Sequence, residues 1–156
     1  MVNLERDCVT EFLAQAEQCY PRECCGLLAG TRKDLVWHVE AIFPLCNMQP
    51  EGVLDSYSFD PKERCEKELE IQKNGLELIG FYHSHPDHGV YFSQRDLENS
   101  EEYQFGEPWL KAVYAYLIVS VQEGVAKDFG IFLVDEGKSK SIHYQILEQG
   151  MQNHVC

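Results

Sequence analysis

The chain has 156 residues and a formal net charge of −13 at pH 7, and this length suits one domain over residues 1–156 with a sizeable core. The acidic balance excludes a nucleic-acid binder, because such a protein needs a basic surface to neutralise phosphates. The sequence has neither an apolar run long enough to cross a bilayer nor an N-terminal signal pattern. We therefore expect a cytoplasmic protein without a membrane partner.

The first part of the chain is predicted to form a helix and then strands. Apolar residues at a helical period place the helix at 4–19, and Pro21 lies just past its end. Strand-like runs follow at 24–29, 35–43 and 57–59. A second helix is expected to run from Pro61 to about Asn74. Its expected N-cap is Asp60 and its expected stop is Gly75.

The rest of the chain adds a strand, a third helix and further strands. The strand contains the apolar run 76–82, and the helix is predicted at 94–104. Three further strands are predicted near 113–121, 129–134 and 141–147. This order of elements predicts an α/β (α+β) fold in which helices flank a β-sheet.

The seven cysteines indicate neither a disulfide framework nor a cysteine zinc site. Their number is odd, Cys24 and Cys25 are adjacent, and no Cys-x-x-Cys motif occurs. Cys24 could be a nucleophile paired with His83, but no nucleophile motif surrounds it, and a buried cysteine in a strand is more common. We expect most of the cysteines to be small reduced hydrophobes.

The most informative pattern is a pair of histidines at the end of a predicted strand. His83 and His85 continue the run 76–82 at positions i and i+2, so both imidazoles leave the same side of the backbone. Pro86 ends the strand because it has no N–H to donate to a neighbour. One metal ion can therefore bind both histidines.

Ser93 and Asp96 follow at the start of the predicted third helix. Taken alone, Ser93 is a helix N-cap and Asp96 is a first-turn acid favoured by the helix dipole. Combined with two imidazoles, the Asp96 carboxylate completes the three ligands of an open catalytic zinc site, whose fourth position holds a water. The Ser93 hydroxyl can cap the helix and also donate to an oxyanion. We therefore predict one Zn²⁺ per chain.

His-x-His-Pro, six residues, Ser, two residues and Asp, with a Glu upstream, resembles the signature of the JAMM (MPN-plus) zinc metalloproteases. In this chain the signature is filled by Glu23, His83, His85, Pro86, Ser93 and Asp96. The flanks resemble the family as well, since 23–30 looks like its first strand and 116–120 like the strand after its site. The resemblance spans roughly residues 20–135, and it implies a single JAMM/MPN-like domain with a mixed β-sheet.

The resemblance also implies a peptidase or isopeptidase that acts on ubiquitin-like tails. The resemblance further implies that Glu23 is the general base, which accepts the proton of the attacking water and returns it to the leaving amine. The connections after Asp96 are short, so the chain looks like the small bacterial members of the family. Those members are associated with ubiquitin-like sulfur-carrier proteins, from which they trim residues after Gly-Gly or release an attached amino acid. We expect the substrate tail to pair as an added strand near 90–93.

Several alternatives remain open at this point. The chain could be a general ubiquitin-like isopeptidase, or a non-catalytic MPN scaffold, although scaffolds typically lack the ligand set. DNA-repair-associated relatives share a similar histidine motif, but this chain is acidic and lacks a helix-hairpin-helix-like extension. His88 could be a further metal ligand, but the turn at 86–89 is a sufficient reason for a polar residue there.

Overall fold

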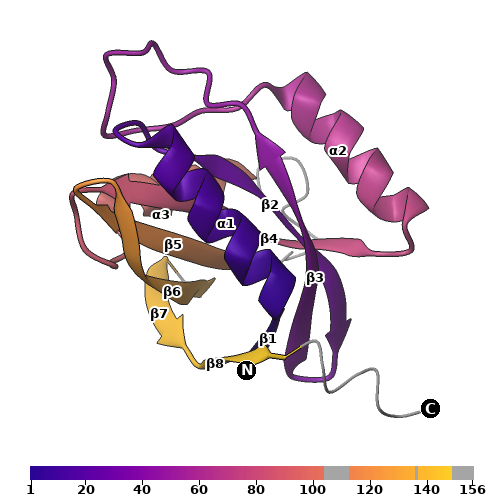
Figure 1. Cartoon of the computed structure of the whole chain (residues 1–156). Helices are drawn as coiled ribbons and strands as arrows, with labels where there is room; N and C mark the ends of the chain where they lie inside the picture. Colours follow the sequence, from indigo (N-terminus) through magenta and orange to yellow (C-terminus); the bar gives the residue numbers. More distant parts are fainter. Residues whose placement is uncertain (104–112, 136, 149–156) are drawn as a thin grey trace.

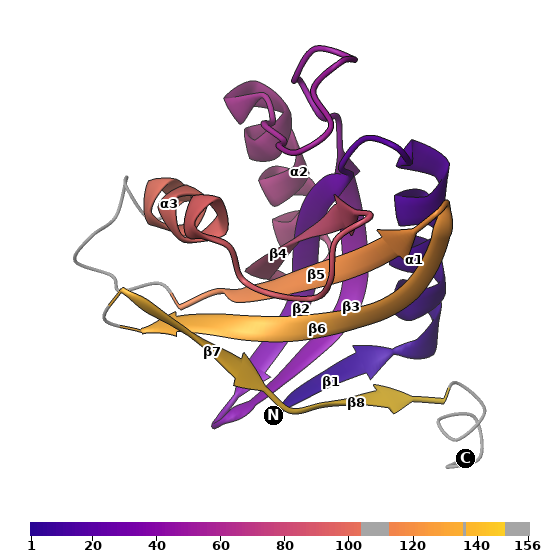
Figure 2. The same ribbon diagram turned by 90° about the vertical axis from the view of Figure 1, so that its left-hand side faces the viewer.

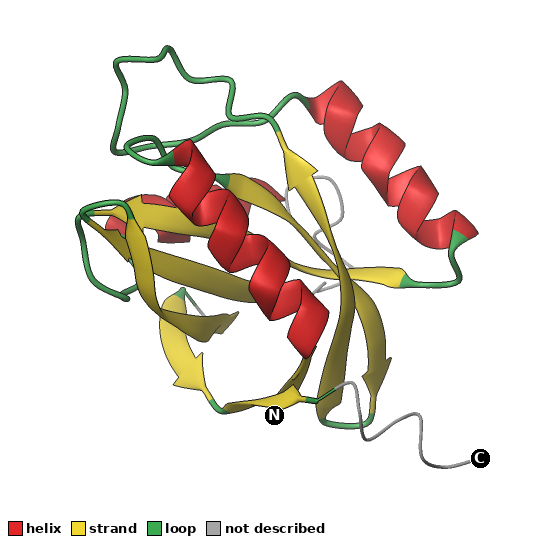
Figure 3. Cartoon of the chain, viewed as in Figure 1, coloured by secondary structure: helices red, strands yellow, loops and turns green. Residues whose placement is uncertain are grey.

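The computed structural model describes residues 1–103, 113–135 and 137–148. The helices are α1 (Arg6–Cys19), α2 (Pro61–Lys73) and α3 (Gln94–Tyr103). The strands are β1 (Val2–Glu5), β2 (Cys25–Lys33), β3 (Val36–Leu45), β4 (Glu77–Pro86), β5 (Ala115–Gln122), β6 (Val125–Asp135), β7 (Lys138–Ile142) and β8 (Tyr144–Leu147). The described strands form one curled sheet in the order β7-β6-β5-β4-β2-β3-β1-β8 (Figures 1 and 3).

Helices pack on both faces of this mixed sheet, which confirms the predicted fold class. Helix α1 buries the apolar residues Cys8, Val9, Phe12 and Ala16 against one face. Ile71 of α2 packs in a second cluster on the other face. Figure 2 shows the curled sheet with α1 on one side and α2 and α3 on the other. The sheet therefore has two hydrophobic layers, as expected for a sheet buried on both faces.

Strand β4 lies in the middle of the sheet and carries the two histidines at its end. It pairs antiparallel with β2, in a register that places Cys25 opposite His83. On its other side it pairs parallel with β5, with His83 opposite Ile118. A parallel pair needs a crossover connection, and α3 lies within that connection. The end of β4 is thus bordered by the start of β2 and the start of α3.

The prediction for the N-terminal segment was wrong at its beginning. The helix starts at Arg6, and the four residues before it form β1, which pairs parallel with both β3 and β8. Val2 and Leu4 alternate with less buried residues, which is the period of a strand. Leu4 also fits the helical period of the following residues, so the helix pattern extended too far.

Two other predicted strands differ from the structure. Residues 57–59 form no strand, and they belong to a long loop at 46–60. The predicted strand 141–147 is interrupted at His143. There the chain passes from β7, which pairs with β6 at one edge of the sheet, to β8, which pairs with β1 at the other edge. The carbonyl of His143 accepts a hydrogen bond from Val2 N at 3.1 Å, so this residue belongs to the crossing between β7 and β8.

The predicted limits of the second helix agree with the structure. The Asp60 side chain caps α2 by accepting from Lys62 N at 3.0 Å, and Gly75 ends it with φ +75°. The six described cysteines are free, whereas Cys156 and the predicted end of the third helix at 104 lie outside the described residues. No helix in the described part is both long and apolar enough to cross a membrane.

Gly80 in β4 provides a test of this packing. A Cβ at Gly80 would lie 2.2 Å from the carbonyl oxygen of Ala115 in β5, so Gly80→Ala forces two paired strands apart. Because overpacking typically costs about 1–3 kcal/mol, we expect a loss of unfolding free energy in that range. Urea denaturation of the metal-free protein measures it. The matched control is Gly52→Ala, whose Cβ meets no atom within 4 Å. Equal stability of the two variants would contradict this account of the β4–β5 pairing.

Candidate functional site

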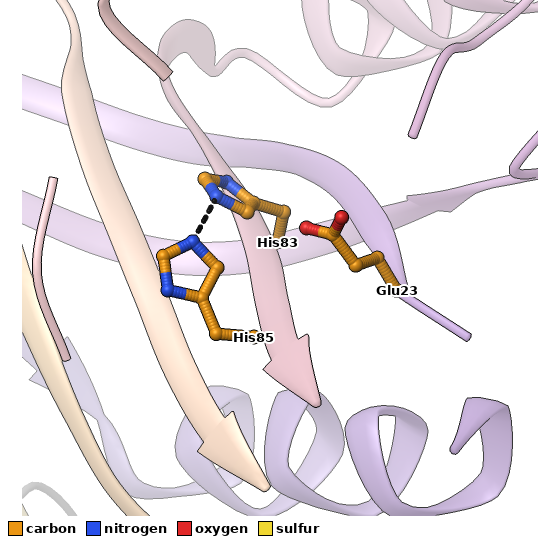
Figure 4. A group of neighbouring side chains, drawn as sticks. All are labelled: Glu23, His83 and His85. Atoms are coloured by element: carbon orange, nitrogen blue, oxygen red, sulfur yellow. Dashed lines mark hydrogen bonds between the residues drawn. The ribbon is translucent and has the colours of Figure 1, made fainter. Parts of the chain in front are cut away.

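The two histidines of β4 point to the same side and meet at their Nε2 atoms. The Nε2 atoms of His83 and His85 are 3.2 Å apart, and the ring centroids are 5.0 Å apart. Figure 4 shows both rings leaving one face of the strand. The two residues are 2% and 7% exposed respectively. The predicted i, i+2 arrangement of the imidazoles is therefore confirmed.

The first turn of α3 brings Asp96 to the same point. Its Oδ1 lies 2.9 Å from Nε2 of His83, and its Oδ2 lies 3.3 Å from Nε2 of His85. Ser93 caps the helix, since its hydroxyl accepts from Asp96 N at 3.0 Å, and Asp96 Oδ2 accepts from Ser93 N at 2.9 Å. This reciprocal pair is a capping box. The cap predicted for Ser93 is confirmed, and it fixes the position of the carboxylate.

Glu23 reaches the site through the pairing of β2 with β4. Cys25 lies opposite His83 in an antiparallel pair. Glu23, two residues before Cys25, therefore lies level with His85, two residues after His83. Ligand atoms of Glu23, His83 and His85 lie within 4.8 Å of one another. Glu23 is 5% exposed, and its carboxylate points toward the histidines (Figure 4). The structure thus brings Glu23, His83, His85 and Asp96 of the predicted centre together, and Ser93 lies beside them as the cap of α3.

Burial and mutual contacts change the protonation of these groups. Burial raises the pKa of Glu23 to about 8, with a further rise from Asp96 and Asp55 that His85 and Arg95 oppose. Burial also lowers the pKa of His83. Burial alone would lower the pKa of His85, but its contact with Asp96 raises it above the usual value. The hydrogen bonds from both histidines overcome burial and hold the pKa of Asp96 well below its ordinary range.

The donor atoms of this cluster fit a divalent metal ion. His85 Nδ1 faces the carbonyl oxygen of Gly89 at 3.1 Å, and since a carbonyl only accepts, Nδ1 carries the proton. When the imidazole is neutral, its lone pair is then on Nε2, the nitrogen that faces His83 and Asp96. Two imidazole nitrogens and a carboxylate that converge on one point are compatible with a cation between them. A neutral His83 and an ionised Asp96 are also the protonation states that metal ligands require.

A loop at 46–60, of which residues 57–59 were predicted to form a strand, packs against His83. Tyr57 in the 46–60 loop is buried and stacks on His83, with ring centroids 4.8 Å apart. Asn47 anchors the loop, because its Nδ2 donates to the carbonyl of Glu23 at 2.9 Å and its Oδ1 accepts from Gln49 N and Ser58 N. The alternation of aromatic residues at 57–59 resembles a strand. An asparagine that caps several backbone groups has no comparable sequence signal.

A cavity of about 390 Å³ opens beside the cluster. Ser93 and Asp96 line it from the N-cap and the first turn of α3, Tyr57 lines it from the loop, and Tyr91 from the segment before α3. Tyr91 is 48% exposed and its ring lies 5.0 Å from that of His85. Glu23 and His85 line the same cavity, which therefore reaches the candidate centre.

Two alternatives raised by the sequence find no support in this geometry. The Cys24 thiol belongs to the cluster packed under α1, and burial raises its pKa to about 12, so it is a structural cysteine and not a nucleophile paired with His83. His88 is exposed at the edge of the cavity. Among the described residues, the group whose ligand atoms lie within 4.8 Å of one another contains Glu23, His83 and His85 and includes neither His88 nor Asp96. Asp96 nevertheless contacts both imidazoles, at 2.9 and 3.3 Å.

Two curated proteins resemble parts of the chain. One is named a probable TtuB-protein conjugate cleaving protease from Thermus thermophilus, and is 35% identical over 80 residues, which are 51% of this chain and 50% of that protein. The other is named desampylase from Haloferax volcanii, and is 34% identical over 100 residues, or 64% of this chain and 63% of that protein. The chain thus spans between half and two thirds of the length of these relatives.

Solved structures resemble the whole fold. A solution structure of a protein from Desulfitobacterium hafniense has a TM-score of 0.77 and 27% identity, and the match covers 96% of this chain and 94% of that one. A crystal structure of a JAB1/MPN domain protein from Archaeoglobus fulgidus shares the fold with a TM-score of 0.56 and 18% identity, over 94% and 99% of the two chains. The family described as prokaryotic homologs of the JAB domain matches residues 5–131. With its sheet, its histidine strand and this match over most of its length, the chain belongs to the prokaryotic JAB-domain family.

Proposed function

We propose that the chain is a zinc-dependent peptidase or isopeptidase that acts on a ubiquitin-like sulfur-carrier protein. It hydrolyses the bond after the carrier's C-terminal Gly-Gly and removes C-terminal residues or an attached amino acid. The observation that carries the proposal is the convergence of His83, His85 and Asp96 on one point, with Glu23 beside them at the edge of an open cavity.

The distances support different roles for the two carboxylates. Asp96 contacts both imidazoles directly, at 2.9 and 3.3 Å, so we assign it as the third zinc ligand. Glu23 lies within 4.8 Å of the histidines, and its raised pKa lets it exchange a proton near neutral pH. We therefore assign Glu23 as the general base and acid. Two imidazoles and one carboxylate also bind Fe²⁺ in oxygenases, so the metal has to be identified by elemental analysis.

The chemistry follows from these assignments. Bound Zn²⁺ would lower the pKa of a water toward 7 and polarise the scissile carbonyl. Glu23 accepts the proton of the attacking water and passes it to the leaving amine, which general acid–base catalysis requires. The Ser93 hydroxyl, whose oxygen already accepts from Asp96 N, keeps its own proton to donate to the developing oxyanion. The N-cap and the first turn of α3 thus contribute one group each.

The relatives and the shape of the site support the substrate class. One relative's name describes cleavage of a protein conjugate, and the other is named a desampylase. The cavity beside His85 is lined on one side by the half-exposed Tyr91. Glycines suit such a passage, because without side chains they let the backbone approach the reacting centre closely. The segment 90–93 borders this passage, and we retain it as the backbone edge that the tail pairs with.

Removing a ligand should deplete the metal. We expect close to one zinc per chain in the wild-type protein, and at least about 100-fold weaker binding in His83→Ala and Asp96→Ala, since loss of a mere supporting residue already costs about 10–100-fold. Elemental analysis and competition with a chelator measure both quantities. His88→Ala is the matched control and should keep its zinc. Full occupancy in either ligand variant, or loss of zinc in His88→Ala, would overturn the ligand assignment.

The variant Glu23→Gln tests whether Glu23 acts as a general base or as a metal ligand. The amide keeps the size of the side chain but cannot exchange the proton, so turnover should fall about 10²- to 10⁴-fold while zinc content and unfolding temperature stay unchanged. Zinc analysis and a single-turnover assay on the same preparation provide the comparison. Loss of zinc together with activity would make Glu23 a fourth ligand, and unchanged turnover would exclude this mechanism.

The carrier itself tests the substrate assignment. A ubiquitin-like sulfur carrier that bears extra residues after Gly-Gly should lose the mass of its tail when it is incubated with the zinc-loaded protein. Intact-mass spectrometry detects the change, which should be absent with Glu23→Gln and when Gly-Gly is replaced by Val-Val. If the carrier stays intact while a generic polyubiquitin chain is cut, the isopeptidase alternative replaces the proposal. If the zinc-loaded protein cuts neither substrate, the non-catalytic scaffold alternative replaces the proposal.

A further inference from the structure

The three residues after Pro86 form a short segment, 87–89, that bears directly on His85. The carbonyl oxygen of Gly89 accepts the proton on Nδ1 of His85 at 3.1 Å. This hydrogen bond decides which imidazole nitrogen carries the proton, and so which nitrogen offers a lone pair to the site. Anything that fixes the position of the Gly89 carbonyl therefore acts on the chemistry of His85.

Asp87 connects this segment to two distant parts of the chain. Its Oδ2 accepts a hydrogen bond from the Tyr20 hydroxyl at the end of α1, at 2.7 Å. Its Oδ1 accepts from Glu123 N, in the turn between β5 and β6, at 2.9 Å. Its own N–H donates to the carbonyl of Val121 at 2.6 Å. One exposed side chain thus joins α1, the histidine segment and the β5–β6 turn.

The backbone of Asp87 is held in a conformation that L-residues seldom adopt. Its φ is +58°, in the left-handed region, where aspartate is tolerated better than most residues. Such a conformation persists only where the surrounding contacts impose it, and it is common next to functional sites. The next carbonyl, of His88, is also held, because it accepts from Ser120 Oγ at 2.5 Å and from Gln122 Nε2 at 2.9 Å. The segment is therefore fixed at each residue before Gly89.

We propose that Tyr20 and Asp87 are positioning residues that hold the Gly89 carbonyl against His85 and thereby fix the Nδ1–H form of its imidazole. Neither residue is among the groups that converge on the centre, and both act through the 87–89 segment. The consequence for metal affinity rests on the proposed function, whereas the consequence for the proton on His85 does not.

The first measurement is made without metal. In the metal-free protein, at a pH where His85 is neutral, its ¹⁵N chemical shifts report which nitrogen carries the proton. We expect the Nδ1–H form in the wild-type protein and a shift toward the Nε2–H form in Asp87→Ala and, to a smaller extent, in Tyr20→Phe. Tyr20→Phe keeps the aromatic ring and removes only the hydroxyl, so it tests the hydrogen bond with little effect on packing.

The chain offers a matched control for the backbone. Asp34 has the same φ of 58° at the turn between β2 and β3, and it is not part of the site. Asp34→Ala therefore carries the same left-handed strain as Asp87→Ala, and it should leave the His85 spectrum unchanged. Asp87→Asn should restore the wild-type spectrum, because an amide tolerates the left-handed region, can accept from Glu123 N and can donate to the phenol oxygen of Tyr20.

The second measurement uses Zn²⁺ in competition with a chelator of known affinity. Because loss of a group that orients a metal-binding histidine typically weakens the metal about 10–100-fold, we expect that loss in Asp87→Ala, a smaller one in Tyr20→Phe and none in Asp34→Ala. If Asp87→Ala and Tyr20→Phe keep both the wild-type spectrum and the wild-type zinc affinity, the pair is a structural staple and the proposal is wrong. If the wild-type protein binds no zinc, the proposed function fails, and the spectra alone decide this inference.

Discussion

The antiparallel pairing of β2 with β4 is the constraint on which the site depends. The register that sets Cys25 opposite His83 brings Glu23 to the histidines from a distant part of the sequence. Pairing also extends to the residue before β2, since Ser84 N donates to the carbonyl of Cys24 and Ser84 Oγ accepts from Cys24 N. A slip of one residue would turn every side chain of β2 to the opposite face. The backbone ladder therefore sets the position of Glu23.

The parts of the site that the sequence predicts are those governed by local geometry. Two histidines at a spacing of two residues must share one side of a strand, and a serine three residues before an aspartate is a capping box wherever a helix follows. Both patterns depend on backbone periods that act within a few residues. For the same reason the helix α2 is predicted well, because its cap at Asp60 and its stop at Gly75 are local signals.

The rest depends on contacts between distant segments, which no local period encodes. Tyr57 stacks on His83 only because Asn47 ties the loop to the backbone of Glu23. The four residues of β1 form a strand because β3 and β8 provide partners on both sides, although Leu4 also fits the helical period. A strand of that length has little propensity of its own, and its partners decide its conformation.

The site also concentrates groups that oppose folding. Two carboxylates and two imidazoles lie almost completely out of water within a few ångströms, and burial of an uncompensated charge is among the largest destabilising terms in a protein. The raised pKa of Glu23 reflects that cost. The surrounding framework offsets it, with α1 packed on one face of the sheet and the aromatic side chains of the second cluster on the other. Such local conflicts are typical of functional sites.

The capping box of α3 has a consequence for the order of that helix. One oxygen of Asp96 serves two partners, since Oδ2 accepts from Ser93 N and also lies 3.3 Å from His85. An interaction that holds Asp96 beside the histidines therefore also holds the first turn of α3. If the Asp96 side chain moves away, the N–H of Ser93 loses its acceptor. By thermodynamic linkage, an ion that binds between these side chains stabilises the start of the helix, and the helix in turn preorganises the site for the ion. The order of the first turn of α3 and the occupancy of the centre are then coupled.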